Sequence, residues 1–265
     1  MQNTTYHKAS SAADAAAKLS SAEDGALLAG GQTLIPTMKA RLAAPSDLVD
    51  ISGAGDMRGI TVSGSSVTIG AMTTHAEVAG SSELAAACPS ICALAGNIGD
   101  PAVRHKGTIG GSVANNDPAA DYPAAMLALG ATINTNARSI AADDFFEGMF
   151  ATALDEGEII TSISFEAPSK GAYAKFPNPA SRYAMCGVYV ADGPAGVRVA
   201  VTGAGNDGVF RHAGMESALS GNWSADAVAG AEVDEGDMLE DLHGDAAYRA
   251  NLVRVMAKRA VAAAG

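Results

Sequence analysis

The chain has 265 residues, a formal net charge of −12 and an apolar content of 48%. This length allows one large domain or two smaller ones, and the acidic balance argues against nucleic acids and acidic membrane surfaces, which attract clustered Lys and Arg. No signal-peptide pattern, no apolar stretch of membrane-spanning length and no disulfide framework is evident. We therefore expect a soluble cytoplasmic protein with reduced thiols and no integral membrane segment.

The first elements predicted along the chain form a small β-α-β-β unit. Ser11-x-x-Asp14 has the pattern of a capping box, which indicates a helix from there to about residue 19. An apolar run predicts a strand over residues 26–29. A helical turn over residues 37–42 and a short strand over residues 48–51 complete the unit.

The stretch LLAGGQTLIP, residues 27–36, contains the first motif that indicates binding. Gly30 and Gly31 follow the predicted strand, and Gln32 and Thr33 come next. Glycine tolerates positive φ, so several N–H groups in such a loop can converge on one phosphate, and Thr33 can add a hydroxyl. The same pattern is typical of a plain tight turn between a strand and a helix.

A β-hairpin and a helix are predicted next. Residues 60–62 and 67–69 flank the turn 63–66, and a helix from Ser81-Ser82 runs toward Ala95. Within that helix Cys88 and Cys92 are four residues apart, on one face. Core packing is favoured over a metal site, because no further Cys or His ligand is evident nearby.

A second diglycine motif occurs in KGTIGGSVANND, residues 106–117. Gly110 and Gly111 stand between Thr108 and Ser112, which repeats the chemistry of the first motif. Two separated loops of this kind can approach a pyrophosphate from two directions. Neither loop fits G-x-G-x-x-G or the P-loop pattern, so the sequence supports neither of those nucleotide sites.

Asp121 precedes a helix that is predicted to run through residue 129. Its carboxylate would cap this helix, or hydrogen-bond to hydroxyls of a ligand, and one carboxylate can do both. Further strands are predicted over residues 131–135, 139–142 and 159–165, and a domain boundary at residues 168–171. Beyond it, three strands of an antiparallel sheet are expected at 172–176, 184–191 and 197–204, and a final helix at 248–263.

No side chain presents itself as a nucleophile or a metal ligand. The five histidines are scattered, and the chain contains neither H-E-x-x-H nor G-x-S-x-G. This pattern indicates that a bound cofactor supplies the chemistry while the protein binds and orients it.

Four segments carry a family resemblance through most of the chain: AGGQTLIP, IGAMTTHAEVA, TIGGSVANNDPAADYPAAMLALGA and EIITSISF. They resemble the FAD-binding medium subunits of the molybdenum hydroxylases, which include xanthine dehydrogenases, and are most similar in pattern to medium subunits of aerobic carbon monoxide dehydrogenases. The resemblance implies an α+β fold in which residues 1–168 form a two-part FAD-binding domain of the vanillyl-alcohol-oxidase (PCMH) type. Its subdomains would cover about 1–55 and 56–168. Residues 170–265 would form a smaller domain with a three-stranded antiparallel sheet and helices.

The resemblance also implies a set of FAD-binding residues. The pyrophosphate would rest on the two diglycine loops, Asp121 would contact the ribityl chain, Tyr183 would stack on the isoalloxazine ring, and Lys175 would lie near its N1–C2 carbonyl edge. A half-buried Tyr at a strand start and a surface Lys are the alternatives for the last two. His75 is interpreted as structural rather than as a covalent attachment point. The full set of expected cofactor-binding residues is Leu28, Ala29, Gly30, Gly31, Gln32, Thr33, Leu34, Thr108, Gly110, Gly111, Ser112, Asp121, Ile160, Lys175 and Tyr183.

The function implied by the resemblance is electron transfer by non-covalent FAD. Electrons would come from a small [2Fe-2S] subunit and ultimately from a large molybdopterin subunit, and would pass to an acceptor such as quinone. These cofactors are expected only in partner chains, because each iron–sulfur cluster needs four cysteines, or two with histidines. The expected assembly is a dimer of heterotrimers.

Two alternatives remain open from the sequence. One is a stand-alone FAD-dependent reductase similar to UDP-N-acetylenolpyruvoylglucosamine reductase, for which Cys186 or Ser181 would have to donate a proton. The other is a structural subunit that has lost its flavin.

Overall fold

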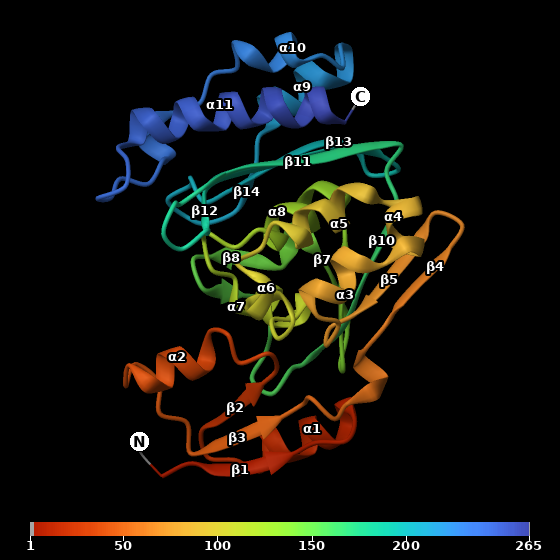
Figure 1. The fold of residues 1–265 in the computed structure, drawn as a ribbon, viewed down its shortest axis with the longest axis vertical. Helices are drawn as coiled ribbons and strands as arrows, with labels where there is room; N and C mark the ends of the chain where they lie inside the picture. Colours follow the sequence, from red (N-terminus) through yellow and green to blue (C-terminus); the bar gives the residue numbers. More distant parts are fainter. Residues whose placement is uncertain (1–2, 265) are drawn as a thin grey trace.

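The structure is a computed structural model that describes residues 3–264. Its elements form three bodies along the long axis, with the N-terminal unit at one end, the C-terminal helices at the other, and the middle of the chain between them (Figure 1). Helices and strands are mixed throughout, so the predicted α+β class is confirmed. Within the described residues, no helix is both long and apolar enough to cross a bilayer.

The N-terminal unit is a three-stranded parallel sheet with the order β1-β3-β2. Its strands are β1 (Thr5–Lys8), β2 (Gly25–Leu28) and β3 (Asp47–Asp50). Helix α1 (Ala12–Ser20) begins where predicted, because the Ser11 hydroxyl accepts a hydrogen bond from the Asp14 N–H. The loop after β2 leads into α2 (Leu34–Lys39), which begins earlier than the predicted helical turn.

The middle of the chain forms a five-stranded antiparallel sheet with the order β4-β5-β10-β6-β7. The strands are β4 (Ile60–Ser63), β5 (Ser66–Gly70), β6 (Thr132–Thr135), β7 (Ser139–Ala141) and β10 (Ile160–Glu166). The helices of this part are α3 (His75–Gly80), α4 (Ser82–Ala87), α5 (Pro89–Gly96), α6 (Pro101–Arg104), α7 (Ile109–Asn115) and α8 (Tyr122–Leu129). A small hairpin, β8 (Phe146–Gly148) with β9 (Ala151–Thr152), was not predicted.

The single helix expected from Ser81 to Ala95 is wrong, because the chain breaks at Cys88. Pro89 disfavours helical geometry in the residue before it, and Cys88 has φ −144° and ψ 75°. Cys88 therefore ends α4, whereas Cys92 lies inside α5. Both thiols are buried in the core, as the packing interpretation required.

The C-terminal part is an antiparallel sheet with the order β11-β12-β13-β14. Its strands are β11 (Lys170–Pro177), β12 (Ala184–Gly193), β13 (Gly196–Thr202) and β14 (Phe210–Arg211). The expected three-stranded sheet therefore has a fourth, very short strand. The helices are α9 (Ala213–Gly221), α10 (Ala225–Ala229) and α11 (Ala246–Ala263). Short 3₁₀ turns complete the chain at Gly55–Met57, Ala142–Asp144 and Glu235–Asp237.

The C-terminal sheet is buried on both faces. Helix α11 packs on β11 and β12, whereas α5 and α8 contact the same sheet from the side of the middle body (Figure 1). Side chains alternate accordingly along β12: Tyr189 belongs to the core of the middle body, and Val188 and Val190 belong to the core under α11. The Tyr189 hydroxyl and Ser90 Oγ share a 2.5 Å hydrogen bond, which joins β12 to α5 inside this contact.

The N-terminal unit meets the middle body where the two diglycine loops approach each other. A Cβ atom added to Gly30 would stand 2.1 Å from the Lys106 carbonyl oxygen and 2.8 Å from Gly107 Cα. In the second loop, a Cβ on Gly110 would stand 2.5 Å from Ala71 Cβ. Backbone contact at this distance requires glycine.

We predict that Gly30→Ala lowers the free energy of unfolding by ~1–3 kcal/mol, because the new methyl group forces the two loops apart. Gly55→Ala is the matched control, since a Cβ there meets nothing within 4 Å. Urea denaturation of both variants measures the effect. Equal stabilities would contradict the contact between the loops.

Candidate functional site

A cavity of about 590 Å³ lies where the N-terminal unit, the middle body and the loop between β11 and β12 come together. Its walls come from β2, from the two diglycine loops, and from segments at residues 98–103, 117–121 and 181–183. The remaining lining residues include Ile51, Ala71, Met72, His75, Ile159 and Ile160. This volume is within the usual range for small-molecule and cofactor sites. Most of its lining is apolar or backbone, with Asp117, Asp121 and Arg182 as the side chains of charged type.

The first diglycine loop offers backbone donors to this cavity. Gly31 has φ +69°, the left-handed conformation that turns consecutive amides toward one side. Within residues 3–264, the N–H groups of residues 30–33 donate a hydrogen bond to no protein atom. Unpaired backbone donors are rare in folded proteins unless solvent or a ligand accepts from them. This loop therefore has the backbone chemistry of an anion-binding site.

The second diglycine loop differs, because its amides are already used. Gly110 N–H donates to the Ala71 carbonyl, and Gly111 N–H donates to the Thr108 hydroxyl oxygen at 3.2 Å. The Thr108 hydroxyl thus caps α7 but keeps its own proton for another acceptor. In this structure the second loop therefore presents the hydroxyls of Thr108 and Ser112 and a close approach at Gly111 to the cavity, while the amides of Gly110 and Gly111 have protein acceptors.

Asp121 lies at one wall of the cavity and is only 5% exposed. Its side chain makes no capping hydrogen bond to α8, so the capping alternative is wrong. Instead its carboxylate accepts hydrogen bonds from the Tyr173 hydroxyl at 2.5 Å and from Lys175 Nζ at 3.0 Å. Burial raises the pKa of Asp121, and the neighbouring Lys175 charge and the Tyr173 hydrogen bond act in the opposite direction.

Residues 181–183, in the loop between β11 and β12, contribute the C-terminal part of the chain to the wall of the cavity. Arg182 has a left-handed φ of 63°, and its guanidinium donates to the Gly99 carbonyl oxygen at 3.3 Å. Tyr183 lines the cavity and is 46% exposed, so one face of its ring can take a flat ligand.

His75 begins α3 and lines the cavity next to Gly107 of the second loop. Its backbone N–H donates to the Gly107 carbonyl oxygen, and its ring packs against Tyr122 with a centroid distance of 5.4 Å. Burial, and then the nearby Arg104 charge, lower the pKa of His75 to about 4, so the imidazole is neutral in the folded protein.

Most residues that the sequence nominated line this one cavity, and two do not. Leu28 ends β2 and packs beside Gly31, and the Lys175 side chain is fully buried behind Asp121. The thirteen that line it are Ala29, Gly30, Gly31, Gln32, Thr33, Leu34, Thr108, Gly110, Gly111, Ser112, Asp121, Ile160 and Tyr183. Sequence reasoning missed the wall formed by Ile98, Gly99 and Val103. The only local signal for that wall is a glycine before Asp-Pro, where Gly99 has φ +49°.

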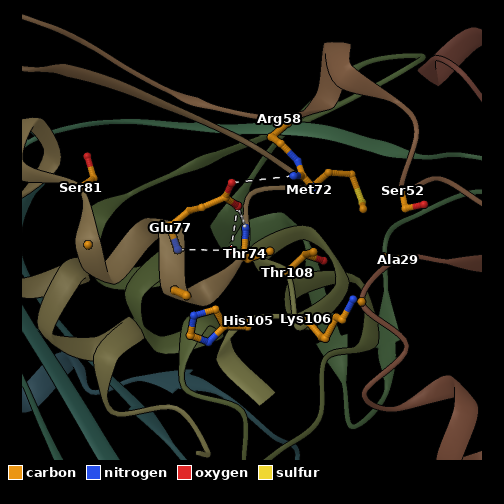
Figure 2. Close-up of a pocket in the computed structure, with 13 residues that line it drawn as sticks. Ala29, Ser52, Arg58, Met72, Thr74, Glu77, Ser81, His105, Lys106 and Thr108 are labelled. Carbon is orange, nitrogen blue, oxygen red and sulfur yellow. Dashed lines mark hydrogen bonds and ion pairs between the residues drawn. The ribbon is translucent and has the colours of Figure 1, made fainter. Parts of the chain in front are cut away.

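A second cleft, of about 670 Å³, adjoins this cavity and shares Ala29, Gly30, Met72 and Thr108 with it. Figure 2 shows Arg58 and Glu77 on one side of this cleft and His105 and Lys106 on the other. Glu77 accepts hydrogen bonds from the backbone and the hydroxyl of Thr74, and its other carboxylate oxygen lies 3.8 Å from Arg58. The lining of this cleft does not include Gln32, Gly111, Asp121 or Tyr183. The residues predicted from the sequence therefore identify the first cavity as the candidate site.

Cys186, a candidate proton donor for a reductase, does not line the cavity. Its side chain is fully buried, and burial raises the pKa of the thiol to about 12. Ser181 does line the cavity, and its hydroxyl oxygen accepts from the Tyr183 N–H at 3.3 Å.

Across residues 3–264 no group of three or more His, Cys, Asp or Glu side chains is arranged to hold a metal.

Comparison with known proteins relates this chain to one family. Residues 2–167 match the family described as the FAD binding domain in molybdopterin dehydrogenase. The chain is 39% identical to the carbon monoxide dehydrogenase medium chain of Afipia carboxidovorans, covering 97% of this chain and 94% of that one. It is 33% identical to the nicotine 6-hydroxylase medium subunit of Paenarthrobacter nicotinovorans, covering 98% and 96%.

Solved structures agree with this relationship. A reconstituted CO dehydrogenase from Oligotropha carboxidovorans matches with a TM-score of 0.89 and 36% identity, covering 99% of this chain and 97% of that one. Quinoline 2-oxidoreductase from Pseudomonas putida 86 matches with a TM-score of 0.87 and 26% identity, covering 98% and 96%. The match extends over the C-terminal sheet as well as the region of the family model.

We predict that His75 makes stability depend on acid pH. The unfolded imidazole takes a proton near pH 6.5, whereas the folded one takes it only near pH 4. The contribution of the neutral His75 side chain to the free energy of unfolding is therefore fully present above pH 6.5. It is lost as the pH falls toward 4, by about 3 kcal/mol in total. Urea denaturation across this range should give a steeper loss for the wild type than for His75→Phe. Parallel curves for the two proteins would refute the assignment.

Proposed function

Because this chain belongs to the family of FAD-binding domains in molybdopterin dehydrogenases, and is thus an oxidoreductase subunit, we propose that it carries FAD for electron transfer within a molybdenum-containing hydroxylase. It receives electrons from a [2Fe-2S] subunit and passes them to an external acceptor such as quinone. Bound FAD supplies the redox chemistry, since it exchanges electrons singly or in pairs. The residues of this chain bind and orient it.

The observation that carries this proposal is the set of unpaired amides in the first loop, opposite the hydroxyls of Thr108 and Ser112 in one cavity. A pyrophosphate needs donors from two directions, and these two loops offer amides from one side and hydroxyls from the other. The cavity contains a place for a flat ring beside Tyr183 and a carboxylate for ligand hydroxyls at Asp121. The chain's residues thus fit FAD held without a covalent bond.

We assign the FAD-binding domain to residues 1–168, with subdomains of about 1–55 and 56–168, and a C-terminal domain to residues 170–265. The family match that ends at residue 167 supports this division, as does the separate hydrophobic core under α11. In this division the cavity lies at the junction of both domains, because residues 181–183 contribute to its wall.

The partners in this proposal are a small iron–sulfur subunit and a large molybdopterin subunit, in a dimer of heterotrimers. The names of two relatives support the presence of partner chains, because one is called a medium chain and the other a medium subunit. The oxidisable substrate would be selected by the large subunit. The relatives act on molecules as different as carbon monoxide and nicotine, according to their names.

We predict that Gly111→Val abolishes FAD binding. A Cβ at Gly111 would point between the loops, 2.9 Å from Thr108 Oγ1 and 3.8 Å from Ala29 Cβ, where the pyrophosphate is expected. The FAD absorbance of the purified protein, measured per mole of chain, reports the result. Gly80→Val is the matched control, because it lines only the second cleft and its Cβ meets nothing within 4 Å. Full FAD content in Gly111→Val would remove the second loop from the site.

We predict that the chain tagged in its native host is recovered with two partner chains, and that the complex contains molybdenum, iron and FAD. Metal analysis and mass spectrometry of the recovered complex measure this. Isolated from its partners, the chain should bind FAD but oxidise no organic substrate. A lone flavoprotein that uses a nicotinamide to reduce an enoyl substrate would establish the reductase alternative instead.

A further inference from the structure

Residues 117–121, which we call the acid loop, form a wall of the cavity and are held by the C-terminal sheet. The Thr202 hydroxyl, at the end of β13, lies within hydrogen-bond distance of two carbonyl oxygens of this loop, at 2.7 Å from Ala120 and 3.1 Å from Pro118. Gly203 N–H donates to the same Pro118 oxygen at 2.8 Å. Ala184 N–H, at the start of β12, donates to the Ala119 oxygen at 3.2 Å. Three successive carbonyl groups of the loop are thus bound by strands of the other part of the chain.

Strand β11 binds the carboxylate at the end of the acid loop. Lys175 Nζ lies 3.0 Å from the Asp121 carboxylate and 3.2 Å from the Asn97 carbonyl oxygen, and the Tyr173 hydroxyl lies 2.5 Å from Asp121. The Lys175 side chain is 0% exposed. One ammonium group therefore connects the acid loop to residue 97, which directly precedes the cavity wall at Ile98 and Gly99.

Lys175 lies behind Asp121 and does not line the cavity. Any effect of its charge on a ligand has to pass through the carboxylate. A buried carboxylate that loses its only cationic partner is strongly disfavoured, and it moves, takes a proton or admits water. Burial holds the pKa of the Tyr173 hydroxyl well above its ordinary value, so this group remains a donor to Asp121.

We propose that Lys175, with Tyr173 and Thr202, is a positioning residue that acts through Asp121 to hold the flavin half of FAD. This inference rests on the proposed function. It divides the binding of FAD between two parts of the chain. The diglycine loops hold the diphosphate, whereas the acid loop, supported by the C-terminal sheet, holds the ribityl chain and ring. This role for Lys175 is different from the contact with the isoalloxazine ring that the family resemblance implies.

The division can be tested with two ligands on the full-length chain freed of flavin. ADP contains the half of FAD that the diglycine loops would hold, and it has no flavin. In calorimetric titrations, Lys175→Met should weaken FAD binding at least tenfold and change ADP binding less than twofold. The visible circular dichroism of the remaining bound flavin should also shift, because the ribityl end is no longer held in one position.

A double-mutant cycle tests whether Lys175 acts through Asp121. Asp121→Asn should weaken FAD binding, and the double variant Asp121→Asn with Lys175→Met should bind FAD no more weakly than Asp121→Asn alone. Lys170→Met is the matched control, because Lys170 is on the same strand and its Nζ lies over the Trp223 ring instead. This control should bind both ligands like the wild type. If Lys175→Met does not fold, Tyr173→Phe, which removes only one hydroxyl group, takes its place in the cycle with Asp121→Asn.

The outcomes separate this inference from the proposed function. Wild-type chain that binds neither ADP nor FAD would overturn the proposed function. Wild-type chain that binds FAD would uphold the assignment of the cofactor. In that case, three results would each overturn the inference: unchanged FAD affinity in Lys175→Met, an equal loss of ADP and FAD affinity, or additive effects in the cycle.

Discussion

The close approach of Gly30 to the backbone of Lys106 and Gly107 is the constraint on which the site depends. At this contact the loop after β2 packs directly against the loop before α7, although the two loops are far apart in the sequence. No side chain fits between them, so glycine is required for backbone geometry and not only for ligand access. The cavity and the second cleft adjoin each other at this contact, because both include Gly30 and Thr108 in their walls.

The two diglycine loops have similar sequences but different hydrogen bonding. Within residues 3–264, the backbone donors around Gly31 have no protein acceptor, whereas those of Gly110 and Gly111 are satisfied inside the protein. A ligand with a diphosphate would therefore meet amides on one side and hydroxyls on the other. Neutral donors suit a chain with a net charge of −12, in which the cavity has few basic side chains. Binding of an anion then depends on geometry more than on net charge.

The C-terminal sheet is more than a cover for the cavity. Its two faces are buried, its β11–β12 loop contributes residues 181–183 to the cavity wall, and its strands supply hydrogen bonds that hold residues 118–120. A buried ion pair such as Lys175 with Asp121 adds little net stability, because desolvation offsets its attraction. It does fix the position of the carboxylate, which is what a binding site needs. The solved relatives match over this sheet as well as over the family region.

The sequence by itself determined the elements whose signals are local. Alternating apolar runs, the Ser11 cap and the two diglycine motifs identify most of the longer strands, α1 and the binding loops within a few residues of their observed positions, but not β1 or the β8–β9 hairpin. It did not determine that Pro89 splits one expected helix in two, nor the short strand β14. Only the tertiary structure decided which amides stay unpaired and that Lys175 binds Asp121 instead of solvent. The Lys175–Asp121 pair joins residues 54 positions apart, and Gly110 N–H donates to the carbonyl of Ala71 in a different element, so no short stretch of sequence carries a signal for either contact.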